Sequence, residues 1–125
     1  MHRRGGSLPV MSATPDALDI TIEDTEAGHL VRVSGELDLA TAPQLSAVLL
    51  DAAGQSTLPV VLDLAGVTFI DSSALRTLVL AGRELADAGR KLQIGARSER
   101  VTKVLEMTQL DQYTEAFQVL PDELA

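Results

Sequence analysis

The sequence predicts an α/β domain, with helices packed on a mixed β-sheet. Its 125 residues match the length of one domain. Along the chain the hydrophobic period switches repeatedly between that of a strand and that of a helix. The resulting order, β-β-α-β-α-β-α-β, is an opening hairpin followed by βα alternation, which predicts right-handed crossovers between parallel strands.

Residues 18–35 predict the opening hairpin. Apolar and polar residues alternate from Leu18 to Ile22, as is typical of a half-buried strand. A turn at 26–28 precedes a second strand from Leu30 to Gly35.

The first helix is predicted from its start signal and its spacing. Thr41–Gln44 fits a capping box, in which the Thr41 hydroxyl accepts from the Gln44 amide and the Gln44 side chain reaches back. Apolar residues recur at helical spacing from Leu45 to Ala52, and Gly54 supplies the stop.

Strands and helices alternate in the second half of the chain. The apolar run Leu58–Leu64 is typical of a central strand covered on both faces, and it resumes at 67–70 after a bend at Ala65–Gly66. We then expect a helix over Ser73–Ala88 ended by Gly89, a strand over Lys91–Ala96, a helix over Ser98–Met107 and a last strand over Tyr113–Phe117.

Residues 1–17 mix Gly, Ser, Pro and Thr, which indicates a disordered N-terminal arm before a domain at 18–125. Met11 is a second candidate start. No run reaches the roughly 18–20 apolar residues that cross a bilayer, and no apolar stretch follows the basic start, so we expect no membrane segment, no secretory signal and a cytoplasmic location.

Composition excludes several functions. The chain has no cysteine, and His2 and His29 lie far apart, so we expect no metal and no cofactor. The net charge is −8, with ten acidic residues and one basic residue, Arg32, between Asp16 and Asp71. This balance argues against nucleic-acid binding. It favours either a partner with a basic face or simple solubility.

Enzyme patterns are missing, so we expect no catalytic residues. There is no Gly-x-Ser-x-Gly elbow with a late histidine, and no glycine-rich phosphate loop. The carboxylate pairs Glu36/Asp38 and Asp63/Asp71 are more typical of loop acids or helix caps than of acid–base pairs.

The junction Asp71–Ser73 is the remaining candidate for a functional site. Asp and Ser are preferred helix caps, which is the simplest interpretation. Two hydroxyls and a carboxylate exceed what capping needs, however, and a helix N-terminus stabilises an added phosphate. Beside Asp71 on an acidic surface, such a phosphate would disrupt a partner contact and leave the fold intact.

Two segments, Gly35–Asp38 and Val61–Leu75, resemble STAS-domain anti-sigma factor antagonists, and the element order matches across Leu18–Phe117. The resemblance implies a STAS domain that is not an enzyme and is a monomer when free. The unphosphorylated form would bind an anti-sigma factor that is an ATP-dependent serine kinase and free the sigma factor, and a serine phosphatase would reset the phosphorylated form.

The resemblance also implies site residues. The phosphate acceptor would be Ser72, with Ser73 the second choice. The partner-binding residues would be Gly35, Glu36, Leu37, Asp38, Asp71, Ser72, Ser73 and Ala74.

Two departures from the family pattern stand out: Ala74 replaces a common glycine, and little chain follows Pro121. Two other functions stay open. A non-switching STAS scaffold, in a stress-sensing complex or with a lipid-transport ATPase, would use Ser72 only as a cap or contact. A nucleotide- or anion-binding domain would use the helix N-terminus, although a glycine-rich cradle and a nearby lysine are missing.

Overall fold

The computed structural model describes residues 8–10, 18–54, 57–110 and 116–121. In this part of the chain, six strands form one sheet and three helices pack against it. The elements are β1 (Leu8–Val10), β2 (Asp19–Asp24), β3 (His29–Leu37), α1 (Ala42–Ala53), β4 (Val60–Ile70), α2 (Ser72–Asp87), β5 (Leu92–Arg97), α3 (Glu99–Met107) and β6 (Gln118–Val119).

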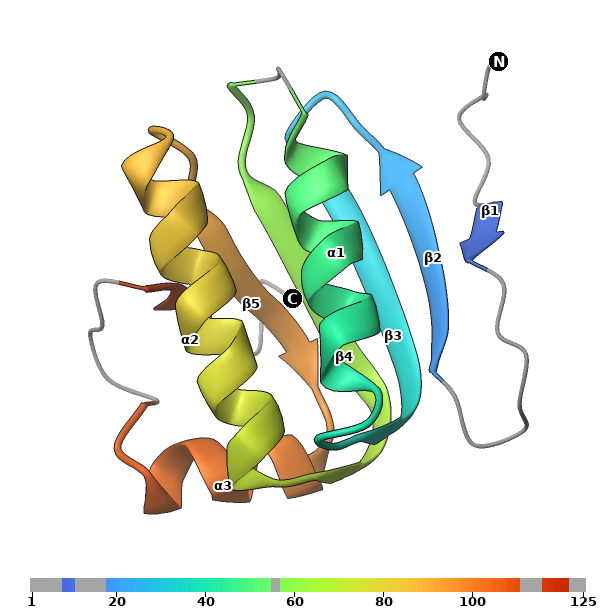
Figure 1. Cartoon of the computed structure of the whole chain (residues 1–125), viewed down its shortest axis with the longest axis vertical. Coiled ribbons are helices and arrows are strands. Elements are labelled where there is room, and N and C mark those ends of the chain that lie inside the picture. The colour runs from blue at the N-terminus through green and yellow to red at the C-terminus, as the bar shows by residue number, and fades with distance from the viewer. Residues whose placement is uncertain (1–7, 11–17, 55–56, 111–115, 122–125) are drawn as a thin grey trace.

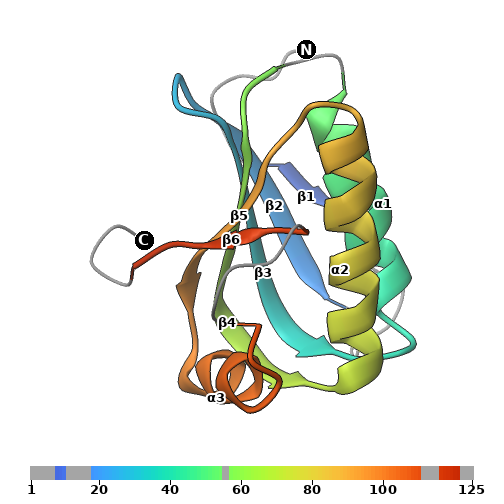
Figure 2. The ribbon, with the colours of Figure 1, turned by 90° about the vertical axis from the view of Figure 1, so that its left-hand side faces the viewer.

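The sheet is mixed, and its strands lie in chain order (Figure 1). β1, β2 and β3 pair antiparallel, whereas β3, β4, β5 and β6 pair parallel. Helices α1 and α2 cover one face side by side, and α3 lies at one end of the sheet against β4 and β5 (Figure 2). The predicted fold class, a hairpin followed by βα alternation, is confirmed.

The core is aliphatic and lies between the sheet and the α1/α2 layer. In β4, Val60, Leu62 and Leu64 are fully buried, whereas Val61 and Asp63 between them are half-buried. Strand β4 is therefore central, as predicted, but full cover of both faces is wrong, because α1 and α2 cover one face and α3 covers only one end of the sheet. The strand runs through the predicted bend at Ala65–Gly66 to Ile70, and its register against both neighbouring strands is irregular there.

Two other predictions need correction. Leu8–Val10 form β1 and pair with β2, so the expected disordered arm does not include these three residues; the rest of 1–17 lies outside the described residues. Such pairing satisfies backbone groups that an edge strand leaves open.

The last strand is Gln118–Val119 and not Tyr113–Phe117, of which 113–115 lie outside the described residues. Phe117, buried before β6, anchors the chain. None of the helices in the described ranges is long and apolar enough to cross a membrane.

Gly82 lets the chain before β6 pack directly on α2. A Cβ atom at this position would collide with the backbone carbonyl of Ala116. A glycine inside a helix is unfavourable by roughly 1 kcal/mol relative to alanine, so the close approach explains its presence.

We therefore expect Gly82→Ala to lower the free energy of unfolding despite its better helix propensity. Overpacking of this kind costs about 1–3 kcal/mol. Arg83→Ala, at an exposed neighbouring position, serves as the control and should stay within about 0.5 kcal/mol of wild type in urea denaturation. A stabilised Gly82→Ala would contradict this account of the packing.

Candidate functional site

Asp71 and Ser72 have different roles at the start of α2. Asp71 is the N-cap, with an extended backbone, and its carboxylate accepts the N–H of Ala74 at 2.8 Å. Ser72 is the first residue of the helix and is exposed, and its hydroxyl makes no hydrogen bond to any described residue. Because the carboxylate does the capping, the Ser72 hydroxyl remains available for chemistry.

The next two residues of α2 are more enclosed. Ser73 is half-buried, and its carbonyl accepts the Thr77 hydroxyl at 3.1 Å. Ala74 is 0% exposed and belongs to the core. Of the two serines, Ser72 therefore has the better access to solvent, and the Ala74 methyl cannot contribute a partner contact.

Strand pairing brings the two predicted segments together. Gly35–Leu37 are the end of β3 and not a loop, and Leu37 pairs with Ile70 of the parallel strand β4. The N–H of Asp71 donates to the Leu37 carbonyl at 3.3 Å. Leu37 is 0% exposed, so its side chain, like that of Ala74, faces the core. Both strands end at the same edge, beside the start of α2 (Figure 1).

The turn between β3 and α1 is organised around Thr41, and the predicted capping box is wrong. Thr41 has a helical backbone and makes no side-chain cap bond. Its hydroxyl donates to the Glu36 carbonyl at 2.8 Å and accepts the N–H of Asp38 at 2.9 Å. The Asp38 carboxylate accepts the N–H groups of Ala40 and Thr41. Because Asp38 already accepts the Thr41 N–H, the Gln44 side chain does not reach back to it. The amide nitrogen of Gln44 is buried and has no hydrogen-bond partner among the described residues.

Three of the four acidic residues singled out in the sequence serve structural roles. Asp63 lies 3.6 Å from the Arg32 guanidinium and accepts the N–H of Ala65, whereas Asp71 caps α2. Asp38 holds its own turn. Glu36 is exposed and is not among the described ion pairs, so it adds negative charge to the surface.

Two exposed apolar side chains belong to the same region and were missed as site residues. Leu39 follows Asp38 and is 71% exposed, and Phe69 pairs with Glu36 across the strands and is 39% exposed. The sequence signal for Leu39 is a large apolar residue placed directly after Asp38, in the turn between β3 and α1. Exposed apolar groups rimmed by charge are typical of protein contact surfaces.

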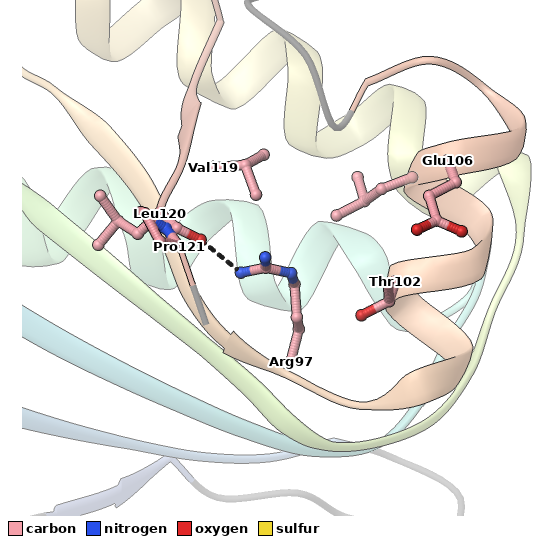
Figure 3. Close-up of a pocket in the computed structure, with 7 residues that line it drawn as sticks. Arg97, Thr102, Glu106, Val119, Leu120 and Pro121 are labelled. Carbon is pink, nitrogen blue, oxygen red and sulfur yellow. Dashed lines mark hydrogen bonds between the residues drawn. The ribbon is translucent and has the colours of Figure 1, made fainter. Parts of the chain in front are cut away.

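A cavity of about 310 Å³ lies elsewhere, between the end of β5, α3 and the segment 119–121 (Figure 3). Arg97 enters it and donates to the Leu120 carbonyl at 2.9 Å. The cavity shares no residue with the Ser72 region. No group of three or more His, Asp or Glu side chains placed to hold a metal occurs within the described ranges. The candidate site is thus an exposed surface.

Comparison with known proteins identifies the family to which this fold belongs. The STAS domain model matches residues 19–122. The chain belongs to the STAS domain family.

Similar proteins with assigned functions are anti-sigma factor antagonists. Anti-sigma-F factor antagonist RsfB of Mycobacterium tuberculosis is 27% identical over 91% of this chain and 92% of its own length. The anti-sigma-B factor antagonist of Staphylococcus aureus is 30% identical over 74% of this chain and 88% of its own length.

Two similar solved structures are also anti-sigma factor antagonists. An anti-sigma factor antagonist from Mycobacterium paratuberculosis superposes with a TM-score of 0.71 and 28% identity, covering 88% of this chain and 91% of that one. The anti-sigma factor antagonist SpoIIAA in its unphosphorylated form has a TM-score of 0.61 and 25% identity, covering 84% and 90%.

Removal of the α2 cap should destabilise the protein. We expect Asp71→Ala to cost about 1 kcal/mol of unfolding free energy, and Asp71→Asn to cost much less, because Asn caps about as well. Denaturant unfolding measures both. Ser98→Ala, which removes the equivalent cap of α3, is a matched control with a similar loss. Equal losses for Asn and Ala at position 71 would show that capping is not the cause.

Thr41 should also be needed for stability. Thr41 is 8% exposed, and Thr41→Val keeps its shape but leaves the Glu36 carbonyl and the Asp38 N–H without their partner. We expect a loss of about 1–3 kcal/mol. Thr77→Val removes only a hydroxyl that bonds back within its own helix, so it should change the unfolding free energy by less than roughly 0.5 kcal/mol. Similar losses for the two variants would contradict this role of Thr41.

Proposed function

We propose that this protein is a phosphorylation-switched anti-sigma factor antagonist, with Ser72 as the phosphate acceptor. The observation that carries the proposal is the exposed, unbonded hydroxyl of Ser72 beside an aspartate that already caps the helix. The names of the similar proteins, antagonists of anti-sigma factors, support the same assignment.

The partner is an anti-sigma factor that acts as a serine kinase, and this chain is its substrate and not a catalyst. In the transfer, a bond forms between the Ser72 oxygen and the γ-phosphorus of ATP. The bond from that phosphorus to the bridging oxygen breaks, ADP leaves, and the hydroxyl proton passes to a base of the kinase. A serine phosphatase reverses the modification by hydrolysis.

The position of Ser72 allows the charge to change without unfolding the domain. At the first residue of α2, the phosphate lies near helix N–H groups that have no intrahelical acceptor, and these favour an anion. The modification adds about −1.5 to −2 charge at pH 7. Asp71, Glu36 and Asp38 already make this edge acidic. The altered surface is therefore the part of the molecule that a partner contacts.

The contact surface is narrower than the sequence predicts. Leu37 and Ala74 are buried, so they position their neighbours and do not themselves contact the partner. The other six predicted residues remain, and Leu39 adds an apolar contact; the six are Gly35, Glu36, Asp38, Asp71, Ser72 and Ser73. A kinase with basic and apolar groups on its docking surface is the complement of this region.

Binding should therefore depend on the charge at position 72. We expect Ser72→Ala to bind the kinase whether or not ATP is present. Ser72→Glu should bind roughly 100-fold more weakly than the unphosphorylated protein, a change of about 2.7 kcal/mol. Calorimetry gives the affinities, and mass spectrometry after incubation with ATP and the kinase locates the phosphate.

Ser73→Ala is the matched control, because it removes the neighbouring hydroxyl and leaves the acceptor in place. It should be phosphorylated as wild type is. Phosphate found only at Ser73, or on no serine, contradicts the proposal. Equal affinities of Ser72→Ala and Ser72→Glu would instead support a scaffold that does not switch.

A further inference from the structure

Arg76 lies one helical turn after Ser72 on the outward side of α2. Both residues are exposed, and so is Leu80 one turn further on, with 52% of its surface accessible. Arg76 makes no hydrogen bond or ion pair with any residue that the structure describes. Arg32 and Lys103, by contrast, each lie within ion-pair distance of a glutamate.

Residues four apart on a helix are neighbours, with about 5–6 Å between their Cβ atoms. The pair is strongest when the acidic member comes first, because this order agrees with the helix dipole. A phosphate on Ser72 and the guanidinium of Arg76 would meet both conditions. Arg76 is also the only charged residue among 72–79, so no second cation on these two turns competes for the phosphate.

We propose that Arg76 holds the phosphate of phosphorylated Ser72 through an intrahelical ion pair. The inference rests on Ser72 as the acceptor and adds a positioning residue to it. A guanidinium offers a planar set of N–H donors that matches phosphate oxygens. Asp71 beside the phosphate, Glu36 near the end of β3 and Asp38 just after it repel the phosphate. These carboxylates and the arginine together direct the phosphate along α2.

The pairing changes two side chains at once. In the unphosphorylated protein, the Arg76 guanidinium is available to an acidic group of a partner. After phosphorylation, the same guanidinium is engaged by the phosphate. The switch then adds a negative charge at position 72 and removes an accessible positive charge one turn away.

The experiment uses full-length protein with phosphoserine installed at position 72 during translation, so no kinase is needed. Phosphorus NMR follows the titration of the phosphate between its singly and doubly charged forms. Arg76 favours the doubly charged form, so the titration midpoint in wild type should lie about 0.3 pH units below that of Arg76→Gln. Arg76→Lys, which keeps the charge, should retain part of the difference.

Arg83→Gln is the matched control. It removes the same charge from the same helix, but position 83 is about 16 Å from position 72 along the axis, so its midpoint should equal that of wild type. Equal midpoints for wild type and Arg76→Gln would overturn the proposal, and so would equal shifts in Arg76→Gln and Arg83→Gln.

Failure of this inference is distinguishable from failure of the proposed function. Should the kinase leave Ser72 unmodified, the NMR measurement still decides whether Arg76 pairs with a phosphate at that position. Should the midpoints coincide while the kinase does modify Ser72, only the role of Arg76 is lost. The unphosphorylated Arg76→Gln protein should unfold at the wild-type denaturant concentration, which excludes a general structural effect.

Discussion

The parallel pairing of β3 with β4 determines where the proposed contact surface lies. It places Leu37 opposite Ile70, and the hydrogen bond from the Asp71 N–H to the Leu37 carbonyl ties the end of one strand to the start of α2. Two segments far apart in the chain thereby form one edge of the sheet. The proposed contact surface depends on this pairing, because neither segment alone presents both the acidic turn and the serine.

Within that edge, the atoms with structural roles are different from the proposed phosphate acceptor. The Asp71 carboxylate begins the helix, Thr41 and Asp38 hold the neighbouring turn, and the Ala74 methyl fills the core. The Ser72 oxygen contributes to none of these. A group that carries no structural hydrogen bond can be modified at little cost to stability, and this separation makes a reversible charge change compatible with an unchanged fold.

Ala74, where the resemblance leads one to expect glycine, fits this arrangement. Its side chain is fully buried and adds both apolar contact and helix propensity at the start of α2. Stiffening the first turn keeps Ser72 and Arg76 at a constant spacing on one helix face. In the proposed switch, the start of α2 is a rigid platform whose charge changes and whose shape does not.

The sequence alone determined the element order from β2 onward, the aliphatic core and the Asp–Ser junction, because periodicity and capping chemistry are local properties. It also led to the family, whose match over 19–122 agrees with the resemblance of 35–38 and 61–75. Tertiary structure decided the rest. Thr41 bonds the end of β3 in place of a capping box, and Leu37 faces inward, since both depend on pairing with distant chain. Strand β6 lies at Gln118–Val119 instead of the predicted Tyr113–Phe117 for the same reason, because a two-residue strand forms only by pairing with its neighbour β5.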